Sequence, residues 1–123
     1  MDITPLVPKS RQVITGYGNG GFKLNHQFTQ GSLLLFPEHS QPWNVTDINK
    51  LTLEDLAPVL NAQGVELLLI GTGASMIPFA PAIRQAFRVK SIAVDVMDTG
   101  AACRTYNVLL AEERRVAAAL IAV

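Results

Sequence analysis

The stretch LLLIGTGASM, Leu67–Met76, decides which fold this chain is expected to adopt. An apolar run ends at Gly71-Thr72-Gly73, as a buried strand does when it turns sharply toward a helix. This turn has two interpretations: a phosphate cradle of a nucleotide-binding fold, or a strand exit that helps to shape a surface. Both place it at the carboxyl end of a strand, where open α/β sheets bind their ligands.

The dinucleotide fingerprint G-x-G-x-x-G is only half present. Gly71 and Gly73 fit, but Met76 occupies the third position. The two prolines that follow delay the helix, so its first amides are not aimed at a pyrophosphate. Asp95 ends the next predicted strand, where a ribose-binding acid would belong. The turn is not followed by Gly-Lys-Ser/Thr, which excludes a P-loop. The strand-exit interpretation is therefore favoured.

Around this stretch the pattern predicts strands that alternate with helices. The expected strands are Glu66–Ile70, Ser91–Val96 and Val116–Val123, and apolar stripes of helical spacing lie within Leu53–Leu60, Phe79–Phe87 and Ala102–Leu110. Thr52 and Asp55 form a capping sequence for the first helix, and Gly64 ends it. Val116–Val123 is apolar throughout, which predicts a strand buried on both faces.

The first third of the chain is expected to be β structure. Arg11–Tyr17 and Phe22–Phe28 flank a glycine cluster that is typical of a hairpin turn. Ser32–Phe36 is a short buried strand. The prolines at its end, Pro37 to Pro42, predict a loop, and Trp43 beside it is expected to fill a gap in the core. The whole pattern predicts a layered α/β domain.

Composition narrows the classes of function. A chain of 123 residues predicts a single domain, 1–123. The net charge is +0 and no basic block occurs, which argues against nucleic acid as a partner. One cysteine and two scattered histidines predict no disulfide and no metal site. No apolar run is long enough to span a bilayer, and the N-terminus lacks the layout of a signal or a mitochondrial presequence. We therefore expect a cytoplasmic protein, and the apolar composition leaves homo-oligomers open.

A second polar cluster surrounds the start of the last predicted helix. Asp98 or Thr99 can cap this helix. Arg104 and Asn107 lie off the apolar stripe and one turn apart, so we expect them to converge on a common point. An ion pair of Arg104 with the nearby acids and an anion site are both open. Cys103 lies on the apolar stripe, which predicts a buried and unreactive thiol.

Three strings carry a resemblance to a known family. They are ITGYGNGGFKLN, GTGASMIPFAPAIRQAF and IAVDVMDTGAACRTYNVLLAEERRVAAALI, and the blocks D-T-x-A-A-C-R-T-Y-N and R-R-V-A-A-A-L-I within the last are the most specific. With them the chain resembles, from about residue 13 to residue 123, the small α/β family that includes the mitochondrial NADH dehydrogenase (complex I) assembly factor 3. The resemblance implies a compact three-layer domain with a mixed β-sheet flanked by helices, which here comprises an N-terminal β-hairpin and a C-terminal β-α-β-α-β region.

The resemblance also implies a function. The mitochondrial relatives assist assembly of respiratory NADH dehydrogenase through protein contacts, so a binding or assembly protein without enzymatic activity and without a cofactor is the first hypothesis. The family motif falls on residues expected to form a ligand or partner site: Gly71, Thr72, Gly73, Asp98, Thr99, Arg104, Tyr106 and Asn107. The second hypothesis is a binder of small anions that uses the Gly71–Gly73 turn and Arg104. The third is an enzyme with Asp95 or Asp98 as its base.

Overall fold

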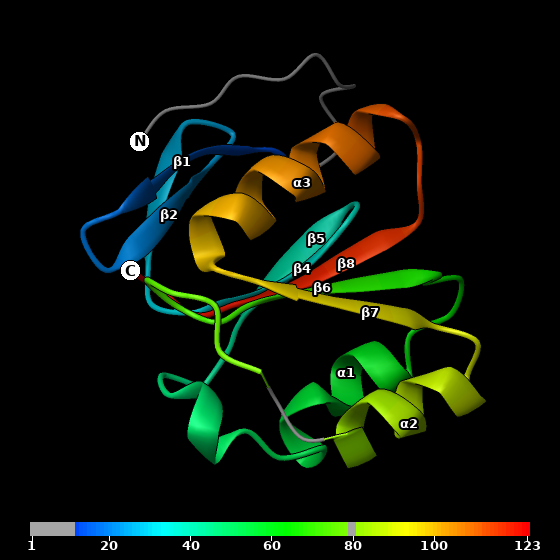
Figure 1. Cartoon of the computed structure of the whole chain (residues 1–123). Coiled ribbons are helices and arrows are strands. Elements are labelled where there is room, and N and C mark those ends of the chain that lie inside the picture. Colours follow the sequence, from blue (N-terminus) through cyan, green and yellow to red (C-terminus); the bar gives the residue numbers. More distant parts are fainter. Residues whose placement is uncertain (1–11, 79–80) are drawn as a thin grey trace.

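The chain folds around a five-stranded sheet whose strand order is β5-β4-β8-β6-β7 (Figure 1). The computed structural model describes residues 12–78 and 81–123. β6 runs parallel to both β8 and β7, whereas β4 runs antiparallel to β8 and β5. The strands are β4 (Leu33–Phe36), β5 (His39–Pro42), β6 (Leu67–Gly71), β7 (Ala93–Met97) and β8 (Val116–Leu120).

A smaller antiparallel sheet is formed by the N-terminal strands of the described chain. Its strands are β1 (Ile14–Gly18), β2 (Gly21–Leu24) and β3 (Gln27–Gln30), in that order. The predicted hairpin is confirmed, and its turn contains Asn19 and Gly20, both at positive φ. The prediction of a single returning strand over Phe22–Phe28 was wrong. A second tight turn at Asn25 and His26, with φ of 50° and 71°, divides it into β2 and β3.

Helices cover both faces of the large sheet, which gives the three layers that the family resemblance implied (Figure 1). The helix α3 (Thr99–Ala111) and the small sheet lie over one face, and α1 (Ala57–Leu60) and α2 (Pro81–Val89) lie over the other. Two 3₁₀ turns, Ile48–Lys50 and Glu54–Leu56, precede α1. The order β6-α2-β7-α3-β8 confirms the predicted β-α-β-α-β region.

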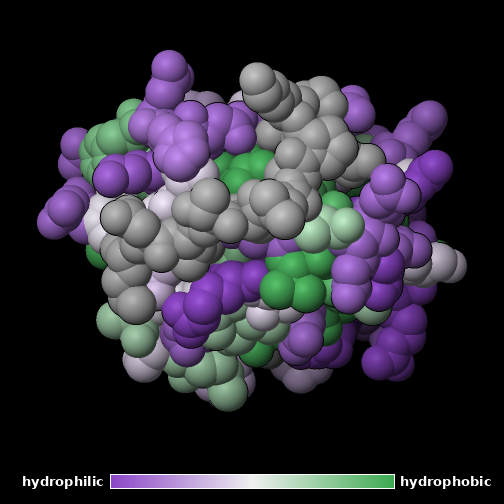
Figure 2. Space-filling model, turned by 90° about the horizontal axis from the view of Figure 1, so that it is seen from above, coloured by the Kyte–Doolittle hydropathy of each residue, from purple (hydrophilic) through white to green (hydrophobic). Residues whose placement is uncertain are grey.

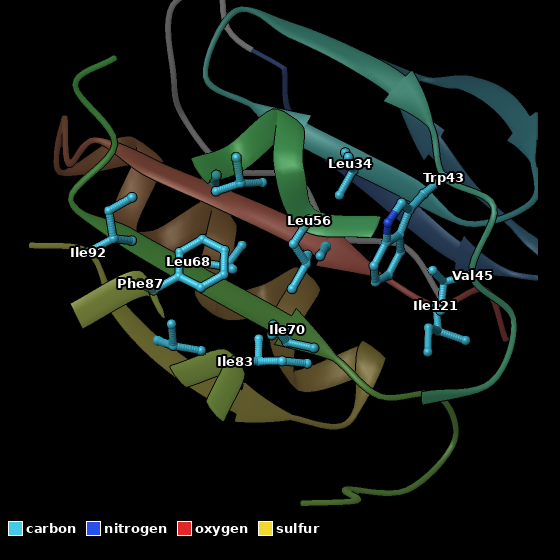
Figure 3. Close-up of a cluster of buried hydrophobic side chains, with 14 of the residues drawn as sticks. Leu34, Trp43, Val45, Leu56, Leu68, Ile70, Ile83, Phe87, Ile92 and Ile121 are labelled. Atoms are coloured by element: carbon cyan, nitrogen blue, oxygen red, sulfur yellow. The ribbon is translucent and has the colours of Figure 1, made fainter. Parts of the chain in front are cut away.

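Each face of the large sheet has its own hydrophobic core. Leu68 and Ile70 of β6 point to the α1 and α2 side, where Phe87 and Trp43 join them (Figure 3). Leu69 points to the opposite side, toward α3. This alternation is the two-residue period of a strand between two layers. All five residues of β8 are buried, which confirms a strand with two covered faces, although it ends at Leu120 rather than at the expected Val123.

Other sequence predictions are partly corrected. The loop expected from Pro37 to Pro42 contains the edge strand β5. The helix expected after Thr52 is reduced to a 3₁₀ turn and one turn of α1. The predicted capping pair nevertheless forms, because the Asp55 carboxylate accepts from the Thr52 amide at 2.9 Å and the Asp55 amide donates to the Thr52 hydroxyl at 3.4 Å. Trp43 fills the core as expected, and its indole N–H donates to the carbonyl oxygen of Asp55 at 2.8 Å. Phe79, expected on the α2 stripe, lies outside the described residues.

Candidate functional site

The Gly71–Gly73 turn leaves β6 and is held by hydrogen bonds from its own backbone. The amide of Thr72 donates to the carbonyl oxygen of Met97 at 2.9 Å, and the amide of Gly73 donates to the Thr99 hydroxyl at 2.9 Å. In return, the amide of Thr99 donates to the carbonyl oxygen of Gly73. Gly73 has a φ of +109°, a conformation that favours glycine.

Thr99 connects three separate segments of the chain. Its buried hydroxyl accepts from Gly73 and donates to the carbonyl oxygen of Ile121 at 2.7 Å, just beyond β8. Asp98, rather than Thr99, caps α3, because its carboxylate accepts from the amide of Ala101 at 2.9 Å. Asp98 and Thr99 were both candidates for the helix cap. The structure gives the cap to Asp98 and uses Thr99 to join the loops.

These bonds close the crevice where a ligand of an open α/β sheet would be expected. The chain leaves β6 toward α2 on one face and leaves β7 toward α3 on the other, so the carboxyl ends of these strands form the topological switch point. Thr72 and Gly73 use their amides to join the two loops. Met76, at the third fingerprint position, is 56% exposed, and α2 begins only at Pro81. This geometry supports the strand-exit interpretation.

The hydroxyl of Thr72 is also used within its own loop. It donates to the carbonyl oxygen of Ser75 at 2.6 Å and accepts from the amide of Ile77 at 3.1 Å. A cavity of about 410 Å³ lies beside this loop, between the first 3₁₀ turn and the residues after β8. Its lining includes Ile48, Thr72 and Ile121 and is largely apolar.

Gly71 has no room for a side chain. A Cβ there would lie 3.0 Å from both Cα and Oγ1 of Thr99 and 3.1 Å from Cδ2 of Leu120. Gly71→Ala is therefore expected to lower the free energy of unfolding by about 1–3 kcal/mol through overpacking. Urea denaturation would measure the loss. Ala74→Gly, at an exposed position of the same loop, is the control, and a Gly71→Ala protein as stable as wild type would contradict the close packing.

The other predicted site residues lie along α3 and have separate surroundings. Arg104 is exposed and donates to the hydroxyl oxygen of Tyr17 at 2.8 Å. Tyr106 is buried, and its hydroxyl donates to the carbonyl oxygen of Phe36 at 3.0 Å. Asn107 is buried against β1. α3 thus directs Arg104 and Asn107 to β1, at Tyr17 and Ile14, and Tyr106 to the end of β4.

The side chain of Asn107 forms the two hydrogen bonds to the Ile14 backbone that a neighbouring strand would otherwise form. Its side-chain oxygen accepts from the Ile14 amide at 3.1 Å, and its side-chain nitrogen donates to the Ile14 carbonyl oxygen at 2.6 Å. Arg104 also contacts β1, but at Tyr17, to whose hydroxyl oxygen it donates. The expected convergence of Arg104 and Asn107 on one point was therefore wrong, because both ends of the Asn107 amide are used by the backbone. Arg104 forms no ion pair within residues 12–78 and 81–123.

Tyr17 and Gly100 were missed by sequence reasoning. The Tyr17 hydroxyl would lie only 2.7 Å from a Cβ placed on Gly100, so glycine lets the ring approach the first turn of α3. A glycine in the first turn of a predicted helix was the signal available in the sequence, since glycine is unfavourable there unless something packs closely.

Cys103 is buried, as predicted, and burial raises the pKa of its thiol to about 12. Because the unfolded thiol ionises near pH 9.0, folding stability should fall as the pH rises above that value toward 12. Between about pH 8 and pH 10, Cys103→Ala should become more stable relative to wild type by about 1 kcal/mol. Urea denaturation at both pH values measures this shift. An unchanged difference would contradict the buried thiol.

Neither a metal cluster nor a membrane-crossing helix is found in the described part of the chain. No group of three or more His, Cys, Asp or Glu residues there could hold a metal ion. No helix there has the length and apolar character needed to cross a bilayer. Asp95, the other acid proposed as a base, is an exposed residue of the edge strand β7.

Comparison with known proteins identifies relatives across most of the chain. NADH dehydrogenase [ubiquinone] 1 alpha subcomplex assembly factor 3 of Xenopus tropicalis is 36% identical over 109 residues, which are 88% of this chain and 60% of that protein. The chain thus spans about three fifths of this relative. An uncharacterized protein of Rhodobacter capsulatus is 37% identical over 88% of this chain and 82% of its own length.

Solved structures share the fold. The crystal structure of an outer membrane protein from Bartonella henselae is 42% identical, with a TM-score of 0.86 over 93% of this chain and 97% of that one. A Mth938-like domain from Bordetella pertussis is 26% identical, with a TM-score of 0.80 over 98% and 92%. A family model matches residues 14–121, which include every strand and helix of the described part of the chain. The chain therefore belongs to the family described as Protein of unknown function (DUF498/DUF598).

Proposed function

We propose that this protein is a non-enzymatic binding protein that assists assembly of a respiratory NADH dehydrogenase. The observation that carries this proposal is its 36% identity, over 88% of the chain, to a protein named as an assembly factor for that enzyme. The site chemistry agrees with a structural use of the motif. Of its eight residues, only Arg104 is exposed and Asp98 partly so, and the other six are buried.

The buried motif residues support the surface that a partner would contact. Thr72, Gly73 and Thr99 fix the loops at the ends of β6 and β7, and Asn107 fixes β1 against α3. Arg104 is the motif residue that a partner can touch directly. The coloured part of the face over α3 mixes hydrophobic with hydrophilic residues (Figure 2).

Affinity capture from an extract of the source organism tests the proposal. Wild type should enrich NADH dehydrogenase subunits over empty resin, as measured by mass spectrometry. Arg104→Ala should reduce the enrichment, whereas Lys50→Ala, which removes an exposed charge from a 3₁₀ turn, should leave it unchanged. Equal recovery of these subunits on the empty resin would contradict the assembly role.

A small anionic ligand at the Gly71–Gly73 turn remains the alternative. The cavity of about 410 Å³ beside Thr72 and Gly73 provides space for such a ligand. The amides of both residues already donate within the protein, and Arg104 does not line the cavity. A thermal-shift panel of phosphates and carboxylates separates the two functions, because assembly activity alone predicts no change in melting temperature.

A further inference from the structure

The outer edge of β7 exposes backbone groups that no strand in the described part of the chain pairs with. β7 ends the strand order. The amide of Ala93 and the carbonyl oxygen of Met97 bond toward β6, so residues 93, 95 and 97 face inward. Val94 and Val96 therefore present their amides and carbonyls outward. The carbonyl oxygen of Val94 accepts from Arg84 at 2.6 Å, and Val96 has no partner for either group within residues 12–78 and 81–123.

A basic groove lies beside α2 at the start of this edge. A cavity of about 340 Å³ is lined by Arg84, Arg88, Ser91, Ile92, Ala93 and Val94. The two arginines lie one helical turn apart on α2, which has no acid in its first turn. Arg88 is exposed and forms no ion pair with any described residue. The groove therefore places positive charge at the edge of β7, two residues before Val96, whose outward backbone groups have no partner in the described part of the chain.

The nearest acid on the same strand points away from α2. Asp95 alternates with Val94 and Val96, which pack into the core beneath α2, so its carboxylate lies on the opposite face of the sheet. No carboxylate is among the residues that line the groove.

We infer that this groove binds an extended acidic segment of a partner protein, which adds a short strand to β7 and places carboxylates against Arg88. The inference rests on the proposed function, since it identifies a second contact surface for that function, on the opposite face of the large sheet from Arg104. Strand addition uses the amide of Val94 and both outward groups of Val96 for affinity, because the Val94 carbonyl oxygen already accepts from Arg84. Side-chain charge gives specificity. A free anion would bind only the arginine side chains and would form no hydrogen bonds with the backbone of β7.

A synthetic peptide pair tests the inference directly. One eight-residue peptide alternates Glu with Val, and its partner has Lys in place of Glu. Fluorescence anisotropy should show binding of the Glu peptide only. Arg88→Glu should weaken it by about tenfold or more, because reversal of the charge turns attraction into repulsion. Lys50→Glu, an exposed charge reversal outside the groove, should bind like wild type.

Amide NMR spectra identify the binding mode. The Glu peptide should shift the amide signals of Val94 and Val96, and inorganic phosphate at matched charge should shift only signals around the arginines. Binding of both peptides with equal affinity, unchanged Val94 and Val96 signals, or undiminished binding to a folded Arg88→Glu protein would each overturn the inference.

The same variant separates this inference from the assembly role. If wild type and Arg88→Glu capture NADH dehydrogenase subunits equally, the assembly role stands and the groove is not its contact. If the Glu peptide binds and depends on Arg88 but no subunit is captured, the groove stands and the assembly role fails.

Discussion

Asn107→Ala is expected to lower the free energy of unfolding by roughly 2–5 kcal/mol. The substitution removes both hydrogen bonds to Ile14, at 3.1 Å and 2.6 Å, and leaves a buried amide and a buried carbonyl without partners. Each such group costs about 1–3 kcal/mol. Because β1 meets α3 at this contact, the small sheet should also lose protection in hydrogen exchange.

Two further variants make this expectation specific. Asn49→Ala, which changes an exposed asparagine, should have little effect on urea denaturation. Asn107→Asp keeps an acceptor but can donate to the Ile14 carbonyl only when protonated. Burial should raise the pKa of the new carboxyl in the folded state, so this variant should gain stability as the pH falls. If the stability of Asn107→Asp did not change with pH, the side chain at this position would not form the two hydrogen bonds to the Ile14 backbone.

Thr99→Val should lower the free energy of unfolding by roughly 2–4 kcal/mol with almost no change in side-chain volume. The valine cannot accept from Gly73 at 2.9 Å or donate to Ile121 at 2.7 Å, and both backbone groups remain buried. Loss of this contact also frees the loop after β6. The amides of residues 72 to 77 should then exchange faster with solvent than those of β6 itself.

Thr99→Ser provides the matched control, because it keeps the hydroxyl and loses only a methyl group. It should recover most of the stability lost in Thr99→Val. Thr105→Val places the same change at a partly exposed position of α3 and should cost less than about 1 kcal/mol. If Thr99→Ser were as unstable as Thr99→Val, packing rather than the hydroxyl would hold the loops together.

Local sequence patterns predicted the elements whose burial has a clear period. The apolar run before Gly71 and the stripe around Tyr106 specify a buried strand and a helix regardless of the rest of the chain. The division of Phe22–Phe28 was missed because Asn25 and His26 adopt positive φ without a glycine to indicate a turn. β5 was missed because Pro37 before it and Pro42 at its end are typical of a loop, although an edge strand tolerates proline.

The candidate site was less predictable because its contacts join distant parts of the sequence. Asn107 bonds to a residue 93 positions away, and Gly73 bonds to Thr99 across 26 positions. Residue type shows that such side chains can donate or accept hydrogen bonds, but only the topology decides whether a backbone group or a ligand receives them. The sequence therefore located the motif, and the fold determined how its side chains are used.

The position of β8 has a consequence for the order in which the protein can fold. β8 follows all other described strands in the sequence, yet it lies between β4 and β6 in the sheet. During synthesis, the β4-β5 hairpin and the β6-α2-β7 unit emerge earlier but have no strand to join them. Both would keep an unpaired apolar edge until residues 116–120 leave the ribosome. Completion of the sheet is thus a late, non-local step, which makes the nascent chain dependent on protection from aggregation until its central strand arrives.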